Sequence, residues 1–313
     1  MGNNILATLA YYDVLDFPLR PEEVLRCLVK INNQLNQTYL NLENVKKTLD
    51  QLLLEKLIDR EGNYYFLSGR DYLVPLRIKR AKISKRKWAK AKGAIGWLQF
   101  FPYLEAVFAS GSLALGNCDE LSDLDVLVVT KHGRIWLARF LITVWFSWLG
   151  VRRKPEQKIA PDKICLNHYI TEKSLRIPFE SLYNAQNYVN LKPLLMRDQS
   201  LITKFQDENN WIKNYIIGPW VLDFDGADRP AVKISFVSGL ISNICRLILD
   251  ASPGNWLEKL TKGYQIKKIV RNPLTRSPSG HVVFNDNQLA FHPDSPEVKI
   301  LETYQMKLKE LGP

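Results

Sequence analysis

Two aspartates separated by one residue are the clearest chemical signal in the sequence. Asp123 and Asp125 lead into the apolar run Val126–Val129, a pattern typical of a strand. Residues two apart on a strand point to the same face, so these carboxylates lie about 7 Å apart along the chain. Two carboxylates this close repel each other and are costly without a cation between them. A hard divalent cation such as Mg²⁺, which prefers a few protein oxygens plus phosphate oxygens, would compensate their charge.

Gly111 and Ser112 add a second chemical element upstream of the aspartates. They lie between an expected strand at 105–110 and a helix start at 113–115. Glycine lets a phosphate approach the backbone closely, and free N–H groups at a helix start, together with the Ser112 hydroxyl, form an anion cradle. A phosphate cradle opposite a metal-binding carboxylate pair is an arrangement for phosphoryl or nucleotidyl transfer.

The combined pattern resembles the DNA polymerase β-type nucleotidyltransferase superfamily. Gly111-Ser112 is followed by ten residues and then by Asp123-Leu124-Asp125-Val126 on a strand; the direct match covers residues 105–130 and extends loosely over 93–171. The resemblance implies that Asp123 and Asp125 bind Mg²⁺ in a two-metal mechanism and that Gly111 and Ser112 hold the β- and γ-phosphates of an NTP. An acceptor hydroxyl would then attack the α-phosphate.

One departure from the superfamily concerns a basic residue. Many small members carry arginine in a GSxARG-like run, whereas this chain has GSLALG, with Leu115 inside it. The resemblance therefore leaves one triphosphate contact without a counterpart, unless Lys131, Arg134 or the basic helix described below supplies it.

The other departure is the third carboxylate, which the superfamily places on a later strand beside the acidic pair. The next expected strand here is 163–171, with Cys165, Asn167 and Tyr169 on one face and Ile164, Leu166, His168 and Ile170 on the other. Asn167 is the polar residue best placed for a third ligand, and Asp162, just before the strand, is the nearby carboxylate. Otherwise a more distant residue fills the role, or the activity is weak or lost. The alternation of His168 with apolar residues favours a buried, hydrogen-bonded histidine over a general base.

The first 70 residues predict three helices followed by a hairpin. The helices cover about 4–14, 21–28 and 42–53, and the hairpin turns through Glu61-Gly62-Asn63. This is the order of a winged helix-turn-helix. Two interpretations stay open: a nucleic-acid-binding module with its third helix in a groove, and a docking or dimerisation module of the same shape.

A strongly basic segment follows. Residues 72–104 contain no acid, and nine bases lie between Arg77 and Lys92. The composition predicts a long helix, and a run of one sign this dense favours contact with phosphates, in a nucleic-acid backbone or a triphosphate. The residues expected to contact nucleic acid are Lys82, Lys85, Arg86 and Lys87.

The rest of the chain predicts mainly helices. They are expected at 181–195, 208–217, 232–250, 254–270 and 296–311, with a hairpin around Asn285-Asp286-Asn287. The apolar runs 135–149 and 232–249 are too short or too polar to cross a bilayer. Both predict core helices, with an interfacial helix the second interpretation for 135–149. The bases from Lys259 to Arg276 favour a solvated helix face over a positive binding surface.

Composition and charge bound the class of protein. The chain has 313 residues, 46% hydrophobic and 24% charged, and a net charge of +11, which excludes disordered, collagen-like and disulfide-scaffold proteins and favours polyanionic partners. Four cysteines without a CxxC pair and four histidines without zinc-ligand spacing predict reduced thiols and no structural metal. The start of the sequence does not resemble a signal peptide. We therefore expect a cytoplasmic protein without a membrane span.

The sequence thus predicts an α+β, multi-domain protein. Its parts are a winged-helix-like module (1–70), a basic connecting helix (71–100), a polymerase β-like nucleotidyltransferase α/β core (101–175) and a mainly helical C-terminal region (176–313). The predicted function is Mg²⁺-dependent transfer of a nucleoside monophosphate from an NTP to a hydroxyl acceptor. The alternative is a non-catalytic nucleic-acid-binding regulator with a degraded core. Asp123 and Asp125 favour the first; the missing third acid and Leu115 favour the second.

Overall fold

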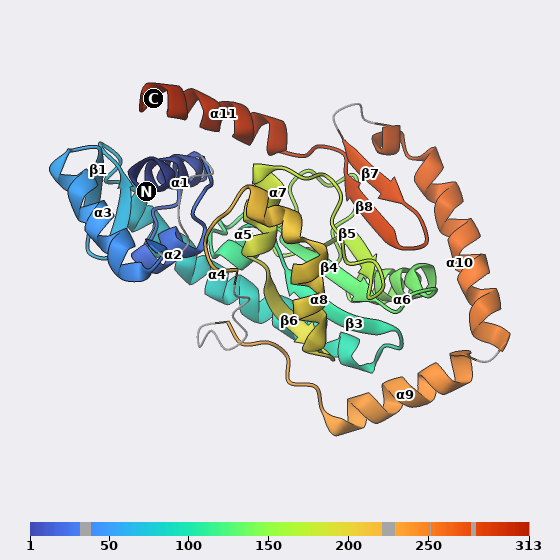
Figure 1. The fold of residues 1–313 in the computed structure, drawn as a ribbon. Helices are drawn as coiled ribbons and strands as arrows, with labels where there is room; N and C mark the ends of the chain where they lie inside the picture. Colours follow the sequence, from blue (N-terminus) through green and yellow to red (C-terminus); the bar gives the residue numbers. More distant parts are fainter. Residues whose placement is uncertain (32–38, 221–228, 251, 277–279, 313) are drawn as a thin grey trace.

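A computed structural model of the chain describes residues 1–31, 39–220, 229–250, 252–276 and 280–312, which form a mixed α/β fold (Figure 1). The α-helices are α1 (Gly2–Val14), α2 (Pro21–Arg26), α3 (Leu42–Leu54), α4 (Leu73–Gly96), α5 (Gly111–Leu115), α6 (Ile135–Trp148), α7 (Leu182–Val189), α8 (Ser200–Glu208), α9 (Phe236–Asp250), α10 (Ser252–Arg271) and α11 (Glu297–Glu310). The strands are β1 (Ile58–Glu61), β2 (Tyr64–Leu67), β3 (Leu104–Ala109), β4 (Leu124–Thr130), β5 (Ile164–Thr171), β6 (Lys192–Met196), β7 (His281–Phe284) and β8 (Gln288–His292). Short 3₁₀ helices include η2 (Trp97–Phe100) and η3 (Asn210–Asn214).

A six-stranded mixed sheet forms the centre of the molecule. Its strand order is β6-β3-β4-β5-β8-β7; β4 and β5 are parallel, and the other neighbours are antiparallel. Side chains of β4 alternate between two cores. Val126 and Val128 pack with α4 and α6, whereas Leu127 and Val129 pack with α7 and α8.

Two helix predictions after residue 176 are wrong. The helix expected at 181–195 ends at Val189, and Lys192–Met196 forms β6, because this short apolar run pairs with β3. Tertiary pairing overrides helical spacing in such a run. The helix expected at 208–217 is replaced by α8 and η3. The hairpin predicted around 285–287 is confirmed, and it joins the central sheet through β8.

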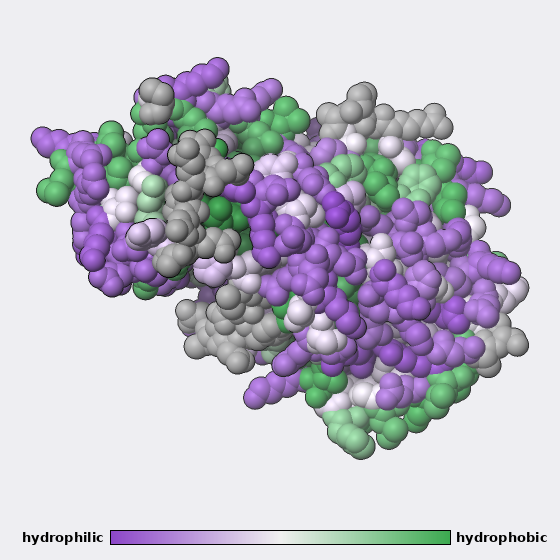
Figure 2. Space-filling model, in the orientation of Figure 1, coloured by the Kyte–Doolittle hydropathy of each residue, from purple (hydrophilic) through white to green (hydrophobic). Residues whose placement is uncertain are grey.

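The two apolar helix runs have different outcomes. Ile135–Ala138, Ile142 and Phe146 of α6 are buried, as predicted. In α9, by contrast, Ser238 and Ser242 are the buried residues. Most of its apolar residues are exposed, although Leu249 is half-buried against Tyr103 and Leu137, so the prediction of a core helix is wrong. Figure 2 shows a hydrophobic band along the lower edge of the molecule, where Figure 1 places α9. None of the described helices is long and apolar enough to cross a membrane.

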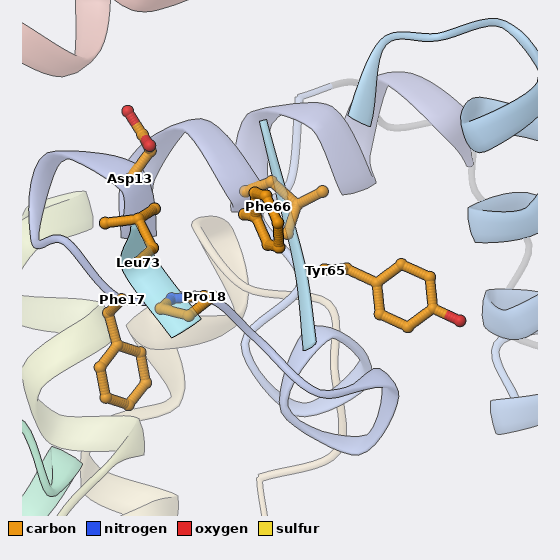
Figure 3. Close-up of a pocket in the computed structure, with 7 residues that line it drawn as sticks. Asp13, Phe17, Pro18, Tyr65, Phe66 and Leu73 are labelled. Atoms are coloured by element: carbon orange, nitrogen blue, oxygen red, sulfur yellow. The ribbon is translucent and has the colours of Figure 1, made fainter. Parts of the chain in front are cut away.

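The predicted helices and hairpin of the first 70 residues are confirmed. The Asn41 side chain caps α3 by accepting the N–H of Asn44 at 2.9 Å, and Gly62 turns the β1–β2 hairpin with φ +59°. Figure 3 shows the apolar crevice where α1 meets this hairpin, lined by residues that include Phe17, Tyr65 and Leu73. It is too narrow to admit a water molecule, so it is packing and not a binding site.

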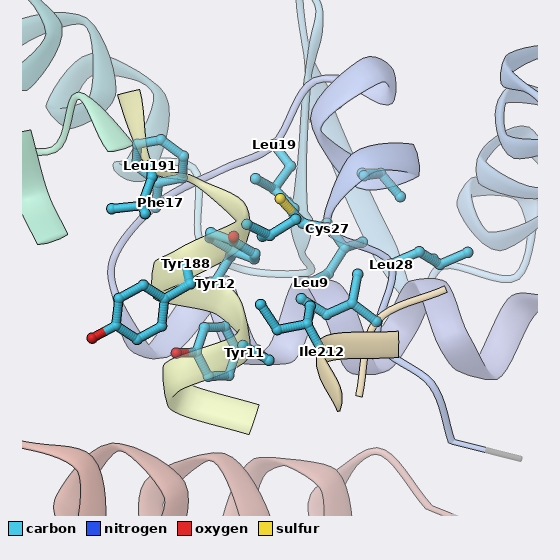
Figure 4. Packing of buried hydrophobic residues seen from close by; sticks show 14 of the residues in the cluster. Leu9, Tyr11, Tyr12, Phe17, Leu19, Cys27, Leu28, Tyr188, Leu191 and Ile212 are labelled. Carbon is cyan, nitrogen blue, oxygen red and sulfur yellow. The ribbon is translucent and has the colours of Figure 1, made fainter. Parts of the chain in front are cut away.

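One continuous apolar core joins the N-terminal elements to the sheet and to α11. It includes Leu9 and Tyr12 of α1, Tyr188 of α7 and Ile212 of η3 (Figure 4). The rings of Tyr11 and Tyr304 meet edge to face at 5.6 Å between centroids, and Lys307 Nζ of α11 lies 2.6 Å from the buried Asp13 carboxylate. Elements from the two ends of the described chain therefore pack as neighbours.

Candidate metal and nucleotide site

The turn after β3 lies directly against the second aspartate. The N–H of Ser110 donates to the carbonyl of Asp125 at 3.0 Å, as the antiparallel pairing of β3 and β4 requires. Gly111 follows with φ +56°, and a Cβ at this position would lie 3.3 Å from Asp125 Oδ2. The left-handed backbone and this close approach both call for glycine. The structure thus brings Gly111, Ser112 and Asp125 together, as the sequence predicts.

Asp123, Asp125 and Cys165 form a cluster of potential metal ligands. Their ligand atoms all lie within 4.8 Å of one another. Burial, and then the neighbouring Asp123 charge, raise the pKa of Asp125 to about 7. Burial and the charge of Asp125 also raise the pKa of the Cys165 thiol well above its usual value. Two carboxylates and a neutral thiol therefore share a site that favours added positive charge.

An arginine supplies part of that charge. Arg153 Nη1 lies 2.5 Å from Asp123 Oδ2 and 3.7 Å from Cys165 Sγ. It comes from the segment between α6 and β5, where its N–H donates to the carbonyl of Ile164 at 2.9 Å. Arg153 was not predicted from the sequence, and Cys165 was not predicted as a ligand. The one sequence signal for Cys165 is its position two residues before Asn167, on the same face of the expected strand.

The alternation of side chains predicted for residues 163–171 is wrong after Asn167, because β5 contains a β-bulge. Asp125 pairs with Cys165 and Leu127 pairs with His168, so two residues of β5 oppose one of β4. After the bulge, Tyr169 packs in the same core as Ile164 and Leu166, while Ile170 packs in the opposite core.

Asn167, the residue predicted as the third ligand, lies beside the cluster of Asp123, Asp125 and Cys165. Asn167 Nδ2 lies 3.4 Å from Asp125 Oδ1 and 3.4 Å from His292 Nδ1. His168 is a buried, satisfied histidine, as predicted: its ring nitrogens lie 3.1 Å from Tyr188 Oη and 3.0 Å from Gln288 Nε2. Burial lowers the pKa of His168 to about 3, so the ring is neutral at physiological pH.

Asp162 is not brought to the cluster. Its carboxylate binds Lys87 at 2.8 Å and also Lys90, both from α4. Lys87 is 1% exposed and also donates to the carbonyls of Glu120 and Ser122. Its ammonium therefore cannot contact a nucleic acid in this conformation, contrary to the expectation from the sequence.

The other expected nucleic-acid contacts stay at the surface of α4. Lys82 and Lys85 are exposed, and Arg86 forms an exposed ion pair with Glu120 at 2.6 Å. Lys131 and Arg134, which could have replaced the missing triphosphate contact, instead bind Asp250 at 3.3 and 3.5 Å. The base beside GSLALG is Arg229, which donates to the carbonyls of Leu113 and Ala114.

A cavity of about 290 Å³ opens next to Asp125. Gly111, Ser112, Leu115 and Asn117 contribute one side of it. The remaining walls come from α1, α7 and α11 and comprise Tyr11, Tyr12, Leu15, Tyr183, Gln186, Asn187, Asn190, Pro296 and Ile300. The site is therefore bounded by the sheet, the N-terminal elements and the last helix together.

The donor atoms suit a hard divalent cation. Asp123 and Asp125 offer carboxylate oxygens, the ligands that Mg²⁺ prefers. The raised pKa of Cys165 keeps its sulfur protonated and hence a poor ligand. The unusual pKa of Asp125 marks a carboxylate that lacks full compensation within the chain. Asp123 and Asp125 are thus the residues that would hold Mg²⁺.

Comparisons with known proteins assign no family to this chain. No family model matches the chain, and neither a curated protein nor a solved structure matches it. The functional argument therefore rests on the geometry of the site.

Proposed function

We propose that this chain is a Mg²⁺-dependent nucleotidyltransferase that moves a nucleoside monophosphate from an NTP to a hydroxyl acceptor: the acceptor oxygen bonds to the α-phosphorus, the bond to the α–β bridging oxygen breaks, and pyrophosphate leaves. One observation carries the proposal: Asp123 and Asp125 cluster beside the left-handed Gly111, and Gly111 and Asp125 line a cavity of about 290 Å³. A carboxylate pair, a phosphate-accessible backbone and an adjoining cavity are the parts that nucleotidyl transfer needs.

In the proposed reaction each residue has a separate task. Asp123 and Asp125 would hold the cation, whose charge would offset that of the triphosphate and favour attack at the α-phosphorus. Gly111 would allow the phosphates to approach the backbone. Ser112 lines the same cavity with its hydroxyl 3.5 Å from Cys118 Sγ, and this hydroxyl would turn toward the phosphates. Arg153 balances the charge of Asp123. The walls from α1, α7 and α11 exclude water and position the acceptor.

The test is the thermal stability of the purified chain with each NTP, with and without Mg²⁺. A ligand at about 100 times its Kd stabilises the native state by about 2.7 kcal/mol. We expect a Mg²⁺-dependent rise of the Tm that disappears in the Asp123→Ala/Asp125→Ala variant. The exposed Glu156→Ala is the matched control and should keep the rise. An equal rise in the double variant would refute the site assignment.

A second candidate function is a non-catalytic nucleic-acid-binding regulator. It is favoured by the Arg153 guanidinium, which already neutralises Asp123, and by Asn167 in place of a third acid. In that case no NTP changes the Tm. Binding of single-stranded RNA or duplex DNA would then depend on the exposed Lys82, Lys85 and Arg86 and would weaken with salt.

A further inference from the structure

Helix α9 is docked on the molecule by its polar side. Ser238 and Ser242 are fully buried, and their hydroxyls donate to Gln99 Oε1 at 2.8 Å and to the carbonyl of Phe101 at 3.1 Å. One turn further, Arg246 donates to Glu105 Oε1 at 2.7 Å. These residues are four apart, so they form a single stripe along the helix. The stripe is held by hydrogen bonds to η2 and β3.

The opposite stripe of α9 is apolar and faces outward. Its residues recur at helical spacing, with exposed fractions of 87% for Phe236, 60% for Val237, 51% for Leu240, 40% for Ile241, 47% for Ile244, 77% for Leu247 and 62% for Ile248. A helix on a globular protein normally buries such a stripe, and soluble monomers rarely expose contiguous apolar patches of this kind. Helix α9 therefore presents a surface suited to an apolar partner.

Helix α10 follows α9 in the chain, meets it near the end of α9 (Figure 1) and carries further exposed aromatic and basic residues. Trp256, Leu260 and Tyr264, four apart, are 62%, 54% and 58% exposed. Trp97 of η2, which also packs against α9, is 53% exposed. Exposed bases of α10 are Lys259, Lys267, Lys268 and Arg271.

The acids of the α9–α10 segment are already bound. Asp250 pairs with Lys131 and Arg134, and the Glu258 carboxylate accepts the N–H groups of Trp136 and Leu137 at the start of α6. Between Phe236 and Arg271 the sequence has six bases and these two acids. Two of the bases, Arg246 and Lys262, are themselves ion-paired, with Glu105 and Asp286. The other four bases are exposed on α10, so the exposed positive charge of this segment lies on α10.

We infer that the outward faces of α9 and α10 bind the surface of an anionic lipid bilayer. A helix that lies in the bilayer interface has one apolar face, with tryptophan and basic residues beside it, and is drawn to anionic lipids. Here the protein body takes the place of water on the polar face of α9. The apolar stripe enters the acyl boundary, while the lysines and Arg271 of α10 meet the headgroups.

Charge favours a bilayer over a second copy of the chain. Each copy carries a net charge of +11, so two copies repel each other on approach, whereas an anionic bilayer attracts the protein. The apolar stripe would be buried in either case. Only the bilayer also accounts for the exposed bases and aromatic residues that flank it.

Flotation of the full chain with vesicles tests the inference. Vesicles with equal parts of phosphatidylcholine and phosphatidylglycerol should carry the protein upward, and vesicles of phosphatidylcholine alone should carry much less. Leu247→Glu should weaken binding by about tenfold or more, because burying a leucine side chain is worth about 1.5–3 kcal/mol. Binding should also fall as salt rises.

The matched control is Leu54→Glu, which makes the same change at an 84% exposed leucine of α3 and should bind like the wild type. Light scattering without vesicles measures the oligomeric state. The inference is overturned if the wild type binds neither kind of vesicle. It is also overturned if Leu247→Glu binds as well as the wild type, or if the wild type binds neutral vesicles as well as anionic ones. If the wild type is dimeric and Leu247→Glu monomeric, with no vesicle binding by either, the stripe binds a second copy instead.

Discussion

The start of β4 and the outer face of α9 both reverse the usual distribution of residues: β4 places a charged residue inside the protein, and α9 places apolar residues at its surface. At β4, the half-buried Asp125 lies beside a second carboxylate, and its pKa rises to about 7. On α9, Leu247 is 77% exposed while Ser242 is fully buried. Charge inside and apolar surface outside both cost stability. We propose that each cost is relieved by something that the chain does not itself provide, a cation in one case and a bilayer in the other.

The largest expected effect concerns the buried charge. A raised carboxyl pKa means that the folded state holds its proton up to about pH 7, while the unfolded chain releases it near pH 3.9. Without Mg²⁺, Asp125 should therefore contribute a fall in stability of up to about 1.4 kcal/mol per pH unit across this window. Burial lowers the pKa of His168 to about 3 and that of His292 to about 4, so these histidines contribute a rise in the same window. The fall is therefore measured as the difference between the wild type and Asp125→Asn, which lacks it.

Urea denaturation at several pH values, in the presence of a chelator, measures this difference. Asp123→Asn removes the neighbouring charge and should make the fall shallower, since Arg153, Cys165 and Asn167 stay in place around Asp125. Parallel curves for wild type and Asp125→Asn would contradict the prediction and would mean that the site compensates its own charge.

A smaller effect is expected where α9 is held to the body. Arg246→Ala leaves Glu105, whose side chain is 15% exposed, without its ion-pair partner, and should cost about 1.5 kcal/mol. The matched control on the same helix is the exposed Asn243→Ala, which should stay within about 0.5 kcal/mol of the wild type. Equal stability of the two variants would mean that polar contacts do not anchor α9.

The smallest expected effect is on the stability of the isolated chain when the exposed face of α9 is changed. Leu247→Glu, measured in urea without vesicles, should change the free energy of unfolding by less than about 0.5 kcal/mol, as should Leu54→Glu. The outward stripe touches water in the isolated chain, so it has no packing to lose. A loss of several kcal/mol in Leu247→Glu alone would show that the stripe is packed within the chain.

Local signals explain what the sequence could and could not predict. The β3–Gly111–β4 arrangement was predictable because it rests on a glycine, a short apolar run and an aspartate pair close together in the chain. The hairpins followed from their turn residues. Arg153, β6 and the bulge in β5 depend on pairing between distant segments. The packing of α9, with its serines buried and its apolar stripe exposed, could not be predicted. Helical spacing identifies an apolar stripe without saying whether it faces the core.

The packing of α11 against α1 has a consequence for synthesis of the chain. Tyr11 and Asp13 are synthesised well before Tyr304 and Lys307, which contact them. The same delay applies to Pro296 and Ile300, which close the cavity beside Asp125. A growing chain therefore contains both aspartates before the residues that complete their cavity have been made. The proposed site is complete only after α11 has been synthesised.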